Sequence, residues 1–202
     1  MNAVGWTASD EGFLVAHQWS QALAGGAAMP QEEAPVQVGP GEVAHARVGP
    51  VAVSGYFGED KQYRSSFFLI GGPVGLAVTG AASLAYNASK KAEAQKAAVP
   101  TWHQLGSAEI VVTSQRLIAT GSGRTESLWY AEIGPLQLVP GRGGAPGVQF
   151  QPSERPLMRL EAPFAPLLYV FVHYLVDGQA PGVPMPAGLL ERARQQGRLR
   201  SA

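Results

Sequence analysis

The sequence predicts an α+β domain in which an antiparallel sheet packs against a buried helix near the C-terminus. Turn residues recur about every ten positions between short stretches rich in Val, Ile and Leu, which is typical of an antiparallel meander. The apolar period changes near residue 163, where an almost wholly apolar helical stretch begins. The chain has 202 residues, of which 46% are apolar, and this is enough for one core but not comfortably for two.

The first expected element is a short helix over residues 10–24. Ser9 is placed to cap it, two acids suit the positive end of its dipole, and Gly25-Gly26 ends it. The Pro-, Gly- and acid-rich stretch that follows predicts a linker. The expected organisation is a short helix and linker over 1–41, a sheet domain over 42–178, and a basic flexible tail over 179–202.

The strands are expected where β-branched and apolar residues are dense. Residues 42–57 predict two short strands or one strand bent at Gly49-Pro50. Residues 108–119 give the clearest strand signal. Further strands are expected over 126–133, 136–139, 148–151 and 157–160. Residues 163–177 predict the buried helix, because prolines stand at its entrance and Gly178 at its exit. This helix is too short to span a bilayer.

A Gly- and Ala-rich insertion over about 61–101 interrupts the strands. From Phe67 to Tyr86 it has 20 residues without a charge, and a helix of about this length matches the hydrocarbon core of a bilayer. The Gly71-Gly72-Pro73 break favours a helix over 73–98 that is apolar only in its first half. Basic residues flank the uncharged run and are expected to contact anionic headgroups: Lys61, Arg64, Lys90, Lys91 and Lys96.

Small residues in the insertion recur every four positions, at Gly71, Gly75, Thr79 and Ser83. This spacing places them on one face of a helix, where another helix or sheet can approach closely. The insertion therefore has alternative interpretations: a segment that dips into or spans a membrane, or a helix packed on the protein's own sheet or on a partner. The basic tail is expected to add a second weak membrane contact through Arg192, Arg194, Arg198 and Arg200.

The sequence contains none of the common motifs that carry catalytic residues. The chain has no Cys, which excludes thiolate chemistry, and it contains neither a G-x-S-x-G elbow nor a phosphate loop. Its four His are not spaced as metal ligands. We therefore expect no catalytic, cofactor or metal site and no enzyme activity. Nucleic-acid binding is disfavoured, because the basic residues are divided between the insertion and the tail.

Three polar features have mainly structural interpretations. Arg116 is expected to pair with a carboxylate or a carbonyl, and Thr113 to act locally beside it. The turn at 141–147 is expected to be a plain hairpin turn. Its alternative is a phosphate site in which backbone N–H groups act with Arg142.

The blocks EIVVTSQRLIA (109–119), SLWYAEI (127–133), GVQF (147–150) and MRLEAP (158–163), followed by an apolar helix, resemble the bacterial PH-like and GRAM-like domains. In that family a strand of the form hydrophobic-Thr-x-x-Arg-Leu precedes a strand with an aromatic residue and Ile. A C-terminal helix closes one end of a bent antiparallel barrel. The resemblance covers about 102–178, with 42–57 as opening strands. It implies a PH-like bent sheet or barrel and a non-catalytic module that binds lipid or protein.

These observations favour a non-catalytic PH-like binding or scaffold module at the cytoplasmic face of a bacterial cell membrane, with residues 67–86 inserted in or dipping into the bilayer. The expected partner is a membrane lipid or a protein. The alternative is a soluble, cytoplasmic, self-associating module with the 73–98 helix as core or oligomer interface.

The predicted sheet also limits the membrane topology. If 42–57 and 108–139 share one sheet, a single span between them is excluded. The insertion then dips and returns or lies on the surface; otherwise the opening strands lie outside the sheet.

Overall fold

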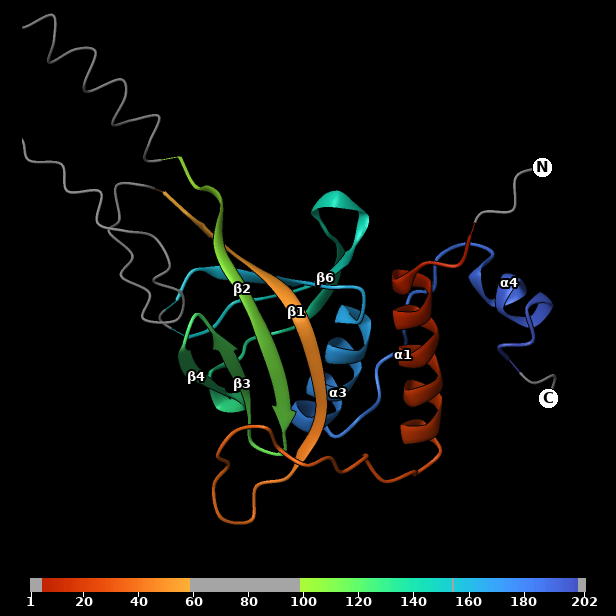
Figure 1. Ribbon diagram of the computed structural model, residues 1–202, viewed down its shortest axis with the longest axis horizontal. Helices are drawn as coiled ribbons and strands as arrows, with labels where there is room; N and C mark the ends of the chain where they lie inside the picture. Colours follow the sequence, from red (N-terminus) through yellow and green to blue (C-terminus); the bar gives the residue numbers. More distant parts are fainter. Residues whose placement is uncertain (1–4, 59–98, 154, 200–202) are drawn as a thin grey trace, which may run out of the picture.

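A seven-stranded antiparallel sheet forms one side of the molecule, and helices form the other (Figure 1). The computed structural model describes residues 5–58, 99–153 and 155–199. The strands lie in the order β4-β3-β2-β1-β7-β6-β5. Their bounds are β1 Ala44–Phe57, β2 Thr101–Thr113, β3 Arg116–Gly121, β4 Arg124–Trp129, β5 Gln137–Pro140, β6 Pro146–Phe150 and β7 Leu157–Glu161.

The central strand β1 holds the sheet together. It pairs with β2 from Ala44 to Phe57, and its second half also pairs with β7. The β1–β2 register shifts between Val48 and Val51, so the stretch predicted as two short strands or one bent strand is one strand with an irregularity at Gly49-Pro50. The opening strand therefore belongs to the same sheet as β2–β4, and the alternative that placed it outside the sheet is wrong.

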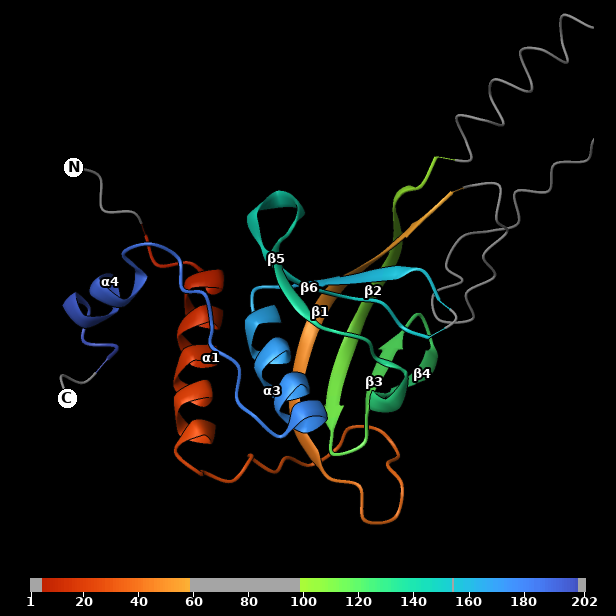
Figure 2. The same cartoon turned by 180° about the vertical axis from the view of Figure 1, so that it is seen from behind.

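Helices cover one face of the sheet in successive layers. Helix α3 (Ala165–Asp177) packs on the strands, α1 (Ala8–Ala24) packs on α3, and α4 (Leu189–Gln195) packs on α1 (Figures 1 and 2). The main core lies between the sheet and α3, where Val51, Ile110 and Phe171 are almost completely buried. The predicted α+β class with a buried helix near the C-terminus is thus confirmed.

Helix α1 is part of this core. Leu14, Ala16 and Leu23 are buried, and a Cβ at Gly12 would lie 1.9 Å from the carbonyl oxygen of Pro163, so the helix backbone runs directly against the entrance of α3. The cap is Thr7 rather than Ser9, because the side chain of Thr7 and that of Asp10 each accept the other's backbone N–H.

The sequence placed two strand ends wrongly. Residues 108–119 form two strands, since the chain reverses at Ser114-Gln115, where the Thr113 hydroxyl accepts the backbone N–H groups of Gln115 and Arg116. The strand expected over 126–133 ends at Trp129 and gives way to a 3-10 turn, Tyr130–Glu132. In both cases short-range hydrogen bonding, which composition does not show, ends the strand.

Candidate functional site

The end of the β1–β2 hairpin is the place from which the insertion leaves the sheet and to which it returns. Phe57 pairs with Thr101 as the last rung of the ladder, whereas the pairing of β1 with β7 ends at Tyr56 and Leu157. β1 and β2 pair along their whole length, and this two-stranded ribbon ends one rung beyond the pairing of β1 with β7. A chain segment joining Phe57 to Thr101 starts and finishes at neighbouring positions.

Four rings gather at this end, and we call Tyr56, Phe57, Trp102 and His103 the hairpin-end aromatic cluster. The centroids of the Tyr56 and Trp102 rings lie 5.4 Å apart, and the rings of Phe57 and His103 stack at 4.3 Å. Tyr56 is 40% exposed, and the nearby Val99 is 59% exposed. The sequence did not indicate that these four rings form one partly exposed group.

Arg159 supports the cluster from β7. Its guanidinium carbon lies 4.1 Å from the centroid of the Trp102 ring, and Nη2 donates to Gln149 Oε1 at 2.9 Å. Its side chain is only 16% exposed, and Nη1 lies 3.8 Å from Glu161. This cation is therefore held in place under Trp102 by a cation–π contact, a hydrogen bond and a carboxylate.

The hairpin-end aromatic cluster suits a boundary between water and an apolar phase. Tyr and Trp have an apolar body and a polar tip, and both are enriched where a protein meets the interfacial layer of a membrane. The rings of Tyr56 and Trp102 are partly exposed at the point where the chain continues toward the uncharged run. The four residues of this cluster are not among the site residues predicted from the sequence.

The residues predicted to contact headgroups lie outside the described residues, as do residues 67–86 and the 73–98 helix. The same holds for the predicted small-residue face. These residues are Lys61, Arg64, Lys90, Lys91, Lys96, Gly71, Gly75, Thr79 and Ser83. Within the described ranges, no helix has both the length and the apolar character needed to cross a membrane.

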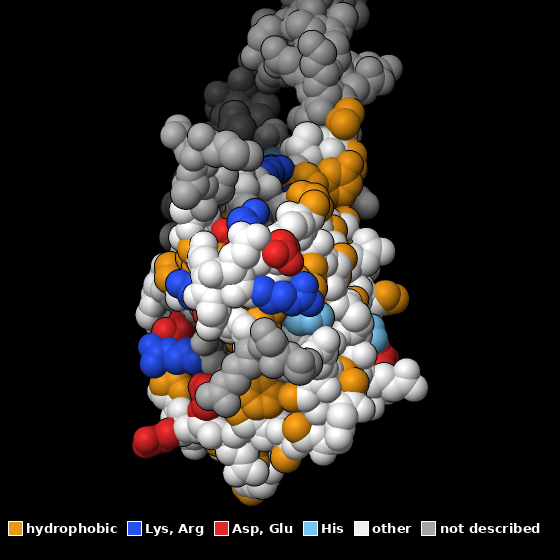
Figure 3. Space-filling model, turned by 90° about the vertical axis from the view of Figure 1, so that its right-hand side faces the viewer, with side chains coloured by type: hydrophobic (Ala, Val, Ile, Leu, Met, Phe, Trp, Pro, Cys, Tyr) orange, Lys and Arg blue, Asp and Glu red, His pale blue; other side chains and the backbone are white. Residues whose placement is uncertain are grey.

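The basic tail is bound to α1 where the structure describes it. Arg192 Nη2 donates to Asp10 Oδ1 at 2.7 Å, and Arg198 Nη1 donates to Glu11 Oε2 at 2.6 Å. Basic and acidic side chains accordingly lie beside one another on the α1–α4 side of the molecule (Figure 3). Because these charges are compensated within the chain, the expected second membrane contact loses much of its basis.

Part of the tail that the sequence predicted to be flexible forms helix α4. The apolar side of α4 is buried on α1, where Leu189 and Ala193 have no exposed surface. Arg194 lies 3.6 Å from Glu191 on the same helix, and Arg200 lies outside the described residues. The division of the chain at 41 and 178 remains a prediction.

A second polar cluster stabilises the fold. The Glu42 carboxylate, which is fully buried, accepts from Arg116 Nε at 2.9 Å and Arg116 Nη2 at 3.0 Å. Thr113 Oγ1 and the Gly39 N–H donate to the same carboxylate at 2.5 and 2.7 Å. Burial by itself would raise the pKa of Glu42, but these hydrogen bonds and the Arg116 charge lower it from 4.5 to about 2. The predicted pairing of Arg116 with a carboxylate is confirmed.

The titratable groups outside this polar cluster include a histidine–aspartate pair and a buried tyrosine hydroxyl. Among residues 5–58, 99–153 and 155–199, no group of three or more His, Asp and Glu is placed to hold a metal ion. His173 Nδ1 lies 3.0 Å from Asp177 on the exposed side of α3, a pairing that the sequence did not indicate. The pKa of the Tyr130 hydroxyl is raised by burial and by the charge of Glu42, and this hydroxyl donates to the Thr113 carbonyl.

Comparisons with known proteins add a single likeness of fold. No family model matches the chain, and no curated protein matches it significantly. Among solved structures, the Vps36 N-terminal PH domain aligns over 74% of this chain and 92% of its own length, at 11% identity and a TM-score of 0.41. An identity and a TM-score this low give no information about the ligand or the partner of this chain. The PH-like class expected from the sequence is supported by the chain's own seven-stranded antiparallel order and closing helix.

Proposed function

We propose that this chain is a non-catalytic PH-like binding module that associates with the cytoplasmic face of a membrane through its β1–β2 hairpin. The single observation that carries this proposal is the hairpin-end aromatic cluster. Its rings are partly exposed at the base of a segment that contains a 20-residue uncharged run flanked by basic residues. Interfacial aromatics beside an apolar run are typical of proteins that enter a bilayer.

The pairing of Phe57 with Thr101 constrains how the segment between them meets the membrane. Both ends leave the same rung of one ladder, so they lie on the same side of any bilayer. A single crossing would separate two strands that are hydrogen-bonded to each other. We infer that residues 67–86 dip into the bilayer and return, or lie in its interface, with Lys61, Arg64, Lys90, Lys91 and Lys96 at anionic headgroups.

Co-sedimentation of the full-length chain with vesicles tests this proposal. Vesicles of neutral lipid are compared with vesicles that also contain an anionic lipid, over a series of salt concentrations. Replacing the four lysines by Gln is expected to weaken binding and flatten its salt dependence, since each base near such a surface contributes about 1 kcal/mol. Unchanged binding would refute the electrostatic part.

Two further variants test the contribution of the hairpin-end aromatic cluster to vesicle binding. Tyr56→Ser and Trp102→Ser are each expected to reduce vesicle affinity about fivefold, because roughly 1 kcal/mol of interfacial burial is lost. The matched control is Trp129→Ser, since Trp129 is 43% exposed but lies on the edge strand β4. Equal effects of the Trp102 and Trp129 variants would argue against a role for the hairpin end.

The same samples address the alternative of a self-associating protein-interaction module. That alternative requires a discrete oligomer in the absence of lipid, disrupted by Gly75→Leu or Thr79→Leu, together with no binding to either kind of vesicle. Light scattering after size-exclusion chromatography measures the oligomer. This combination of results would replace the membrane proposal.

A further inference from the structure

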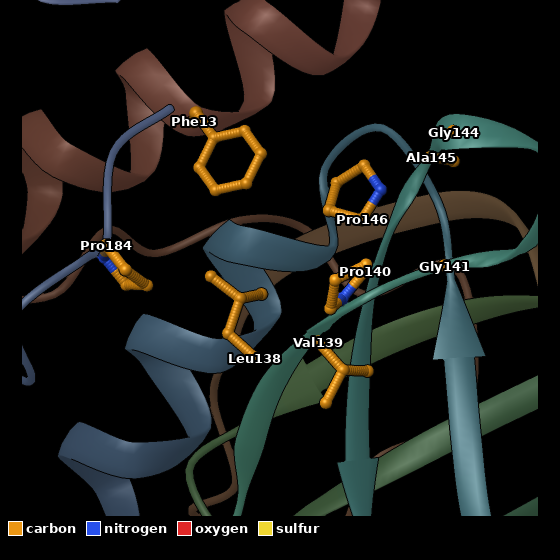
Figure 4. A pocket seen from close by; sticks show the side chains of 9 residues that line it. All are labelled: Phe13, Leu138, Val139, Pro140, Gly141, Gly144, Ala145, Pro146 and Pro184. Carbon is orange, nitrogen blue, oxygen red and sulfur yellow. The ribbon is translucent and has the colours of Figure 1, made fainter. Parts of the chain in front are cut away.

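A cavity of about 340 Å³ lies where α1, the β5–β6 hairpin and the linker between α3 and α4 meet. Phe13 projects from α1, Leu138 and Pro140 from β5, Pro146 from β6, and Pro184 from the linker, and these side chains surround a single space (Figure 4). The volume lies at the lower end of the range of small-ligand pockets. It is remote in the chain from the hairpin-end aromatic cluster and independent of the insertion.

The walls of this cavity are rigid and apolar. Pro140, Pro146 and Pro184 have fixed φ angles and carry no N–H group, so they offer a ligand apolar surface without a backbone donor. Gly141 keeps the hairpin tight, because a Cβ there would lie 2.1 Å from the carbonyl oxygen of Ala145. The side chains that line the cavity are apolar, which favours an alkyl chain as the occupant.

One exposed cation lies in the turn that borders the cavity. Arg142 lies in the turn between the lining residues Gly141 and Gly144, and its side chain is exposed. In the part of the chain that the structure describes, the guanidinium of Arg142 has no carboxylate partner. Glu161 accepts the backbone N–H of Arg142 at 2.6 Å and is itself buried beside Arg159. Left-handed backbone at Gly143 (φ 73°) and Gly144 (φ 88°) lets the chain reverse next to this arginine.

We propose that this cavity binds a single-chain anionic amphiphile such as a fatty acid, with the alkyl chain in the cavity and the carboxylate at Arg142. Apolar lining side chains beside a turn that carries an exposed cation match that chemistry, since the chain loses contact with water and the carboxylate gains a charge-assisted hydrogen bond. The volume accommodates one short chain and not the two chains of a bilayer lipid. This site goes beyond the proposed membrane association and does not depend on it.

Binding of decanoate to the full-length chain tests the proposal without any membrane. Titration calorimetry, followed by amide shifts in NMR spectra, is carried out below the micelle concentration. Decyltrimethylammonium has the same chain with the opposite charge and serves as the matched ligand. We expect decanoate to bind at least tenfold more tightly, with shifts at Phe13, Leu138 and Ala145.

Two kinds of variant distinguish the contribution of the decanoate carboxylate from that of its alkyl chain. Arg142→Glu is expected to weaken decanoate binding at least tenfold, whereas Arg124→Glu, the same charge change in the exposed β3–β4 turn, leaves it unchanged. Leu138→Trp fills the cavity and is expected to abolish binding. Ala145→Phe does the same from the rim if Leu138→Trp fails to give a folded protein, as judged by circular dichroism.

The outcomes are decisive in both directions. Equal affinity for the two amphiphiles, an inert Arg142→Glu variant, or shifts confined to Tyr56 and Trp102 would overturn the proposal. Vesicle binding by Leu138→Trp distinguishes the two sites, because it stays at the wild-type level if membrane association uses the hairpin end alone. Loss of decanoate binding with intact vesicle binding therefore supports the cavity, whereas retained decanoate binding by Leu138→Trp would overturn it.

Discussion

Replacing Glu42 by Gln is expected to destabilise the fold by about 3–5 kcal/mol at neutral pH, because it leaves the partly buried Arg116 without its counter-charge. The carboxylate is fully buried and accepts from four donors. A neutral amide has one acceptor oxygen, and its NH₂ group would face donors. The pKa supports this size, since lowering it from 4.5 to about 2 corresponds to about 3 kcal/mol.

The pH dependence of the free energy of unfolding tests the same prediction independently. Because the pKa of Glu42 is lower in the folded protein, its stabilisation is complete above pH 4.5 and is lost as the pH falls through about 2. Urea unfolding of wild type and Glu42→Gln at several pH values between 7 and 2 measures the gap between them. We expect that gap to close progressively below pH 4.5.

An exposed ion pair between β1 and β2 is the control. Arg47 and Glu109 lie 2.5 Å apart, with side chains 55% and 33% exposed, so Glu109→Gln is expected to cost less than about 1 kcal/mol. A loss below about 1 kcal/mol for Glu42→Gln at neutral pH would refute the reasoning. So would a gap between wild type and variant that stays constant down to pH 2.

Two further predictions concern the packing of the terminal helices, and urea unfolding measures both. Gly12→Ala is expected to lower the free energy of unfolding by about 3 kcal/mol or more, because its Cβ would meet the backbone of Pro163. The control, Gly182→Ala, has open space around it and should change the free energy by no more than about 0.5 kcal/mol. Equal effects of the two variants would contradict the close approach of α1 to Pro163. Leu189→Ala is expected to lower the free energy of unfolding by about 2–4 kcal/mol, since that side chain is fully buried. Leu190→Ala should lower it clearly less, because Leu190 is only half-buried. No effect of Leu189→Ala would mean that α4 does not pack on α1.

The features that could be predicted from the sequence are those encoded within a few neighbouring residues. The buried helix at Ala165–Asp177 follows from its apolar run, its prolines and Gly178, which adopts φ 70° at the C-cap. The strand signal at 108–119 was correct, but its division at Ser114-Gln115 depends on hydrogen bonds of a single side chain, Thr113.

The features that could not be predicted join residues far apart in the chain. Arg116 was expected to pair with a carboxylate, but its partner Glu42 precedes it by 74 residues and directly follows the expected linker. The weak apolar stripe of α1 gave no sign that its backbone would touch Pro163. The cavity near Phe13 is likewise invisible in the sequence, because its walls come from α1, β5, β6 and a linker.

The long ribbon of β1 and β2 has a consequence for how this domain folds. Its rungs join residues on either side of segment 58–100, so the most extensive pairing in the sheet forms only after a long loop has closed in the unfolded chain. Each halving of that loop removes about 0.6 kcal/mol of closure entropy, and non-local strand pairing is a slow step in folding. Joining Phe57 to Thr101 by a two-residue Asn-Gly turn would convert the ribbon into a local hairpin, and folding of the sheet would become faster without a change in its strand order.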